Sequence, residues 1–83
     1  MNVVQLYDVV RMHGVEVEPG VFQDETVLRA VPMSAGLARA KNGVREDADE
    51  TFYVIRSGGE NLSDIAAYVY AGEAGGPVVE ENT

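Results

Sequence analysis

The hydrophobic residues of the N-terminal half change their spacing along the chain, and each spacing predicts a different element. Residues 2–13 predict a short helix, because they contain an apolar stripe at helical spacing that consists of Val3, Leu6, Tyr7 and Val10. Residues 15–18 alternate valine with glutamate before Pro19 and Gly20, which predicts a half-buried strand and a turn. Residues 26–31 predict a second strand, and residues 34–41 predict a second short helix.

A charged segment follows these elements. Residues 45–50 read REDADE, a pattern typical of a solvated linker or turn. We therefore interpret residues 1–83 as a single small domain, in which an acidic linker (45–50) joins an N-terminal region (1–44) to a C-terminal region (51–83).

The C-terminal region has the clearest pattern, TFYVIRSGGENLSDIAAYVYAG over residues 51–72. Aromatic and β-branched residues at 52–55 predict a strand, and the glycines that follow allow a tight reversal. Asn61 is a suitable N-cap and Asp64 favours the positive end of a helix. A helix is therefore expected from residue 61 to 71, with an apolar stripe of Leu62, Ile65, Ala66 and Val69. Residues 78–82 predict one further helical turn.

This strand, turn and helix pattern resembles the first half of a LysM module, a small fold that binds N-acetylglucosamine polymers and recurs in phage tails. The family pattern is Tyr-x-Val-x-x-Gly-Asp-Thr-Leu-x-x-Ile-Ala-x-x-Tyr-Gly, followed by Ile-x-x-x-Asn. The resemblance spans residues 52–82, and its main matching residues are Val54, Gly58, Leu62, Ile65, Ala66, Tyr70, Gly72, Val78 and Asn82.

The segment departs from the LysM pattern in its turn and at its end. Gly59 lengthens the turn, Glu60 stands where aspartate is usual, and Ala71 precedes the final glycine. The resemblance also lacks the second strand of the module. An unpaired strand edge promotes association, so strand 52–56 is expected to pair elsewhere. The candidates are residues 15–18, residues 27–31, or a strand of a neighbouring protein.

Taken together, these patterns predict an α+β fold. We expect a small antiparallel sheet of two or three strands, two or three short helices, and a LysM-like C-terminal half.

Composition and charge narrow the possible partners. The chain has 14 acidic and 6 basic residues, for a formal charge of −8, which disfavours direct binding to nucleic acid or to anionic membranes. The N-terminus lacks the basic region of a signal peptide, and no apolar stretch approaches the ~20 residues that span a bilayer. We therefore expect the protein in a virion or in the host cytoplasm.

The sequence offers no catalytic constellation. His13 is the single histidine, the chain has no cysteine, and the residues show neither zinc-site spacing nor a phosphate loop. We expect no enzymatic activity, no metal and no cofactor.

Three functions remain as hypotheses. The resemblance implies a small structural protein that acts as a joint in a phage tail, baseplate or related virion assembly, as a homo-oligomer or in a hetero-assembly. It also implies an alternative, a module that binds peptidoglycan or chitin-type glycans. The charge alone suggests a third function, an acidic inhibitor of the anti-CRISPR or anti-restriction type that docks on a basic partner.

Each binding hypothesis names candidate residues. The glycan-binding residues implied by the resemblance are those of the turn, namely Gly58, Gly59, Glu60, Asn61 and Leu62. The expected contacts with a protein partner are Tyr68, which lies off the apolar stripe, together with Phe52 and Val54 on the predicted strand.

Overall fold

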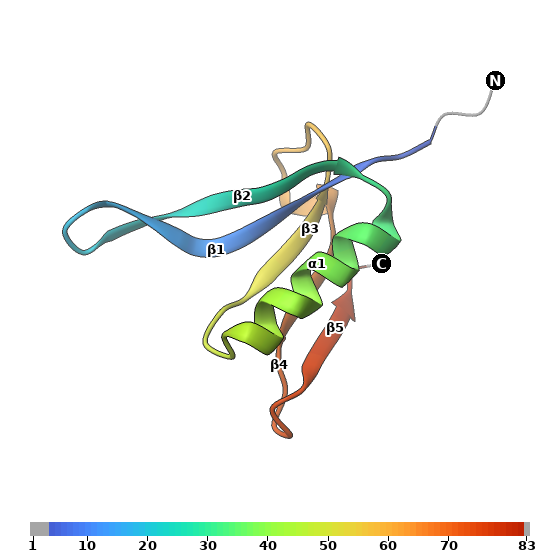
Figure 1. The fold of residues 1–83 in the computed structure, drawn as a ribbon. Coiled ribbons are helices and arrows are strands. Elements are labelled where there is room, and N and C mark those ends of the chain that lie inside the picture. Colours follow the sequence, from blue (N-terminus) through green and yellow to red (C-terminus); the bar gives the residue numbers. More distant parts are fainter. Residues whose placement is uncertain (1–3, 83) are drawn as a thin grey trace.

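An antiparallel sheet forms the body of the protein. The computed structural model describes residues 4–82, which form five strands, one α-helix and one 3₁₀ turn (Figure 1). The strands are β1 (Tyr7–Glu18), β2 (Val21–Val31), β3 (Phe52–Arg56), β4 (Ile65–Ala71) and β5 (Pro77–Glu81). Helix α1 (Met33–Glu46) joins β2 to β3, and the 3₁₀ turn η1 (Leu62–Asp64) precedes β4.

The strand order across the sheet is β2-β1-β3-β4-β5. β1 pairs with β2 along its length, but it pairs with β3 only over residues 7–11. Residues 12–24 therefore form a hairpin of two strands that projects from the sheet (Figure 1). Its turn contains Pro19 and Gly20, and Gly20 has the positive φ of 79° that glycine adopts readily.

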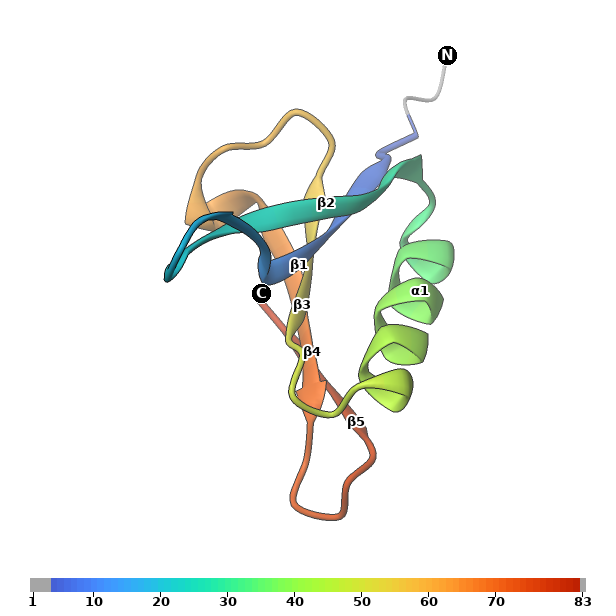
Figure 2. The same cartoon turned by 60° about the vertical axis from the view of Figure 1, so that its left-hand side comes forward.

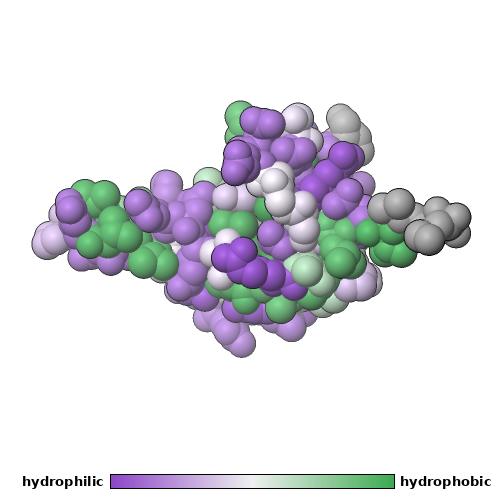
Figure 3. All heavy atoms as spheres, turned by 90° about the horizontal axis from the view of Figure 1, so that it is seen from above, coloured by the Kyte–Doolittle hydropathy of each residue, from purple (hydrophilic) through white to green (hydrophobic). Residues whose placement is uncertain are grey.

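Hydrophobic side chains gather at the far end of this hairpin, as the view from above shows (Figure 3). The large apolar residues exposed there are Val17, Val21 and Phe22.

Helix α1 covers one face of the sheet, while the opposite face carries no helix in the described chain (Figure 2). The buried core lies between α1 and the sheet and consists of Val9, Ala40, Val44, Phe52, Val54 and Val69. A Cβ at Gly43 of α1 would overlap the ring of Phe52, so the helix approaches the sheet as closely as its backbone allows. The guanidinium carbons of Arg11 and Arg39 lie 5.6 and 5.7 Å from the centroid of the same ring.

The predicted fold class is wrong, because the described chain has five strands and a single α-helix where two or three strands and several helices were expected. The LysM-like strand is present as β3, but the helix expected after it is replaced by the 3₁₀ turn η1 and strand β4. Residues 65–71 fit both helical and alternating spacing, and the alternating pattern prevails: Ile65, Ala67 and Val69 are buried, whereas Ala66 and Tyr68 between them are partly exposed. Leu62 of the predicted helical stripe is 77% exposed. β-branched and aromatic side chains in this segment favour the strand.

The two other helical predictions are also wrong in the described chain. Residues 7–13 belong to β1, where Val9, which lay off the helical stripe, is fully buried beneath α1. Residues 2 and 3 of the predicted helix lie outside the described residues. Residues 78–81 belong to β5, which pairs with β4.

The remaining elements are confirmed, although β3 pairs differently from the prediction. Residues 15–18, 26–31, 34–41 and 52–55 lie in β1, β2, α1 and β3. Helix α1 continues to Glu46, so residues 45 and 46 of the segment interpreted as an acidic linker are helical. β3 is an interior strand that pairs with residues 7–11 on one side and with β4 on the other. The strand therefore pairs with an N-terminal strand of the same chain, as one alternative held, but through residues 7–11 of β1 and not through residues 15–18 or 27–31. No helix among residues 4–82 combines the length and the apolar character of a membrane-spanning helix.

Gly43→Ala is expected to lower the free energy of unfolding by about 1–3 kcal/mol, even though alanine favours helix formation. The new methyl group would overlap the Phe52 ring, which is 1% exposed and cannot move aside easily. Urea denaturation followed by circular dichroism measures the change.

Gly76→Ala is the matched control. A Cβ there meets no atom within 4 Å, so we expect a change below about 0.5 kcal/mol. A Gly43→Ala protein as stable as the parent would contradict the close contact between α1 and β3.

Candidate functional site

The sheet face opposite α1 carries a row of tyrosines. Tyr53 of β3 is paired with Tyr68 of β4, and their ring centroids are 6.2 Å apart. Tyr70 lies two residues farther along β4, and its hydroxyl donates a hydrogen bond to Oε2 of Glu80 at 3.3 Å. Each of the three tyrosines is partly exposed. This face therefore presents aromatic and polar groups to a ligand or a partner.

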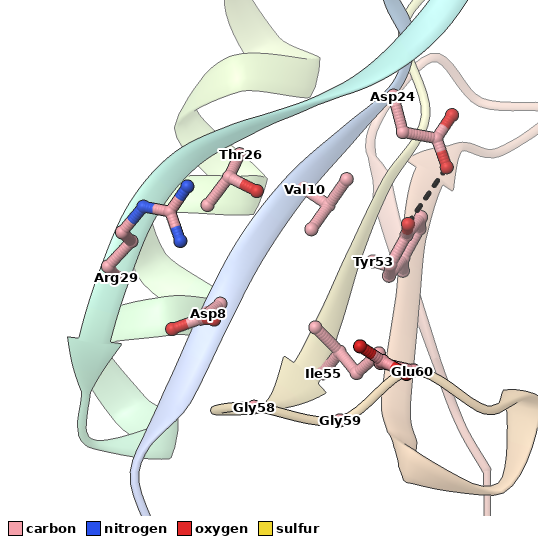
Figure 4. A pocket seen from close by; sticks show the side chains of 10 residues that line it. All are labelled: Asp8, Val10, Asp24, Thr26, Arg29, Tyr53, Ile55, Gly58, Gly59 and Glu60. Atoms are coloured by element: carbon pink, nitrogen blue, oxygen red, sulfur yellow. Dashed lines mark hydrogen bonds between the residues drawn. The ribbon is translucent and has the colours of Figure 1, made fainter.

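A hollow of about 320 Å³ opens beside Tyr53 (Figure 4). Strands β1, β2 and β3 and the turn after β3 contribute its walls. The polar wall residues are Asp8, Asp24, Thr26, Arg29, Tyr53 and Glu60. Val10 and Ile55 supply apolar wall, and Gly58 and Gly59 close one end.

Two aspartates of the hollow are held in place by hydrogen bonds. The Asp24 carboxylate accepts bonds from the Tyr53 hydroxyl at 2.8 Å and from the His13 backbone N–H at 3.0 Å. The Asp8 carboxylate accepts bonds at 2.8 Å from the Ala30 backbone N–H and from the Ser57 hydroxyl. Both side chains are therefore fixed before any ligand arrives.

The same bonds support an unusual backbone. His13 and Ala30 have φ values of 52° and 53°, and no other non-glycine residue of the described chain has a positive φ. Each donates its N–H to an aspartate of the hollow. Such a conformation is disfavoured for residues with a Cβ and tends to occur at functional sites.

The environment of the tyrosines changes their acidity. Burial, the hydrogen bond that Tyr53 donates to Asp24, and the electrostatic effects of Asp24 and Tyr68 raise the pKa of Tyr53 to about 12. The charge of Glu80, with its hydrogen bond, raises the pKa of Tyr70. Tyr53 therefore stays a neutral donor at physiological pH.

The charges of the hollow are unbalanced. Asp8, Asp24 and Glu60 face a single guanidinium, that of Arg29. The one ion pair within residues 4–82 lies elsewhere, between Arg11 and Glu25 at 3.7 Å. The hollow therefore combines a negative potential with one positive group that forms no ion pair among residues 4–82.

The residues predicted for glycan binding divide between the hollow and the surface beyond it. Gly58, Gly59 and Glu60 line the hollow. Asn61 does not: its backbone N–H donates to Asp64 at 3.1 Å. Leu62 is 77% exposed and is also absent from the lining. Glycan binding by this turn stays a prediction.

The residues predicted for protein contact also differ in position. Tyr68 lies on the open face and is partly exposed. Phe52 and Val54 are 1% and 0% exposed and pack beneath α1, so a partner cannot touch their side chains without opening the core.

Sequence reasoning missed the part of the hollow that β1 and β2 supply. Asp8, Asp24 and Arg29 reach it because the hairpin bends at residues with irregular pairing. The order Asp8, Val9, Val10 was a weak signal of this wall of the hollow. Successive side chains of a strand point to opposite faces, so Asp8 and Val10 lie on the face opposite the core residue Val9.

Residues 4–82 contain no group of three or more acidic or histidine side chains arranged to hold a metal ion. No protein-family model, no curated protein and no solved structure matches this chain. We therefore infer its function from the open sheet face, the hairpin and their charges.

Asp24→Asn is expected to lower the pKa of Tyr53 from about 12, because the substitution removes a negative charge beside the phenol. Tyrosine Cζ chemical shifts recorded against pH measure this change. Glu80→Gln removes an equal charge beside Tyr70 and should lower the pKa of Tyr70 alone. An unchanged Tyr53 pKa in Asp24→Asn would contradict the role assigned to this aspartate.

The raised pKa also predicts how stability depends on pH. In the unfolded chain, the phenol of Tyr53 has the ordinary tyrosine pKa of 10.0. In the folded protein it keeps its proton to higher pH. Its contribution to stability is therefore complete below about pH 10 and is lost as the pH rises to about 12. Tyr53→Phe should abolish this part of the alkaline loss of stability, measured by urea denaturation at each pH.

Proposed function

We propose that this protein is a small non-enzymatic joint between larger proteins, of the kind that phage tails, baseplates and related virion assemblies contain. The observation that carries the proposal is the projecting β1–β2 hairpin, which ends in exposed apolar side chains.

The shape of the hairpin supports a role in contact with a partner. The Cα positions extend 46 × 33 × 19 Å, so the described chain is distinctly elongated. Residues 12–24 have no third strand beside them, and an isolated two-stranded hairpin is marginally stable in water. A partner that packs around the hairpin would supply the missing contacts.

The surface of the tip supports the same role. Val17, Val21 and Phe22 are 46%, 47% and 50% exposed. Large apolar side chains gathered on an exposed projection are typical of interaction sites. Glu16 and Glu18 flank them, so the complementary surface is an apolar groove with a basic rim.

One observation favours a second candidate function. The chain has 14 acidic residues, yet a single ion pair occurs among residues 4–82. Its negative charge is thus free to attract a basic surface, which suits an acidic inhibitor of the anti-CRISPR or anti-restriction type. Binding by such an inhibitor should weaken steeply as salt rises, whereas an apolar joint should depend on salt much less.

The proposed role as a joint is tested by replacing Phe22 with a photoreactive phenylalanine analogue. The protein is then cross-linked to its partners in the cells that make it. We expect a single major product, with one other protein of a large assembly, because Phe22 is the largest exposed side chain of the tip. The matched control places the analogue at Ala74, an exposed residue of the loop between β4 and β5, and should give no such product.

Two results would overturn the proposal that this protein is a joint. Products that form equally from Phe22 and Ala74 would mean that the tip is not a specific contact. A product that joins only copies of this chain would mean a homo-oligomer without a second protein. Phe22→Ser should unfold at nearly the same temperature as the parent, because the side chain is half exposed, and it should lose the assembly.

A further inference from the structure

We infer that the hollow beside Tyr53 binds the cationic side chain of an arginine or lysine from the partner protein. This inference rests on the proposed function, since a protein partner presents the side chain. It assigns a ligand class to a site that lies apart from the hairpin tip.

Charge is the first reason for a cationic ligand. Asp8, Asp24 and Glu60 line the hollow against the single cation Arg29, within a chain of formal charge −8. Asp8 and Asp24 each accept two hydrogen bonds from the protein, while a carboxylate offers about four lone-pair sites. Both therefore retain acceptors for the N–H groups of a guanidinium or an ammonium.

The walls also match the rest of such a side chain. Val10 and Ile55 offer apolar surface for an aliphatic stem, and the ring of Tyr53 borders the same space (Figure 4). A cation near a tyrosine ring gains a further electrostatic attraction. The volume of about 320 Å³ lies at the lower end of the range of ligand pockets, which suits one side chain and not an extended polymer.

The site is organised in advance. The backbone N–H groups of His13 and Ala30, both with positive φ, and the hydroxyls of Tyr53 and Ser57 hold the two aspartates. A ligand that meets fixed carboxylates loses less affinity to the ordering of side chains. The disfavoured backbone at these two residues thus has a role in recognition.

Arg29 tunes the site. Its side chain lies on the β2 side of the hollow (Figure 4), and it makes no ion pair with a described residue. The positive charge of Arg29 repels an incoming cation, but Arg29 forms no ion pair with the carboxylates that line the hollow. Removal of this charge should therefore strengthen binding.

The test is an NMR titration of the free protein with N-acetylarginine amide and N-acetyllysine amide. We expect amide shift changes confined to the lining of the hollow, with dissociation constants in the millimolar range. N-acetylcitrulline amide has nearly the shape of the arginine probe but no charge, and it should bind at least about fivefold more weakly.

Matched substitutions separate the hollow from the general acidity of the chain. Glu60→Gln should weaken binding roughly two- to fivefold, whereas Glu73→Gln, which removes the same charge from the β4–β5 loop, should leave it unchanged. Arg29→Gln should strengthen binding by a similar factor. If Glu60→Gln and Glu73→Gln changed binding equally, the cation would be attracted by the general negative charge of the chain, and the proposed site in the hollow would be wrong.

Three further results would overturn the inference. They are an absence of shift changes with either cation, equal binding of the citrulline probe, and binding of the N-acetylglucosamine trimer in place of the cations. The last result would assign the hollow to a glycan.

The two proposals fail independently. Because the titration uses the free protein, its failure leaves the cross-link from Phe22 untouched. Failure of that cross-link, with specific binding of the arginine probe, would remove the joint and keep the cation site.

Discussion

The contact between α1 and β3 is the constraint on which the rest of the structure depends. A single helix has to cover the one apolar face of the sheet, so it must lie close along it. Three small residues, Gly36, Ala40 and Gly43, lie with Val44 on the buried side of α1, and their small size allows this approach. Phe52 fills the space under Gly43, with two arginines against its ring. Since the core is complete on this side, the opposite face is left for polar and aromatic groups.

The sequence allowed α1 and β3 to be predicted, because each contains a single unambiguous pattern. β4 was missed for a physical reason: Ile65 and Val69 are four residues apart and satisfy both a helical stripe and an alternating strand. The segment forms a strand because it pairs with β3 on one side and with β5 on the other. These contacts lie outside the segment, so its own sequence does not reveal them. The N-terminal helix failed similarly, since the buried position of Val9 depends on α1.

The candidate site was predictable only where one local turn forms it. Gly58, Gly59 and Glu60 were expected in the turn after β3, where they line the hollow, and their expected role in glycan binding stays a prediction. The opposite wall depends on the positive φ of His13 in β1 and of Ala30 in β2. Neither residue is a glycine, so nothing in the amino-acid types announces a positive φ there. Asp24 and Asp8 accept hydrogen bonds from the backbone N–H groups of His13 and Ala30 and also line the hollow. The same two side chains therefore stabilise the disfavoured backbone and supply negative charge to the site.

The order of strands in the sheet has a consequence for how the chain folds. Three of the four strand pairings, β1–β2, β3–β4 and β4–β5, join segments that are neighbours in sequence and close through short connections. The fourth pairing, between β1 and β3, brings Val9 beside Val54 across the whole of β2 and α1. Long loop closures are slow and entropically unfavourable. The N-terminal hairpin and the C-terminal meander each close through short connections, and we expect the pairing of β1 with β3 that unites them to be the slowest step of folding.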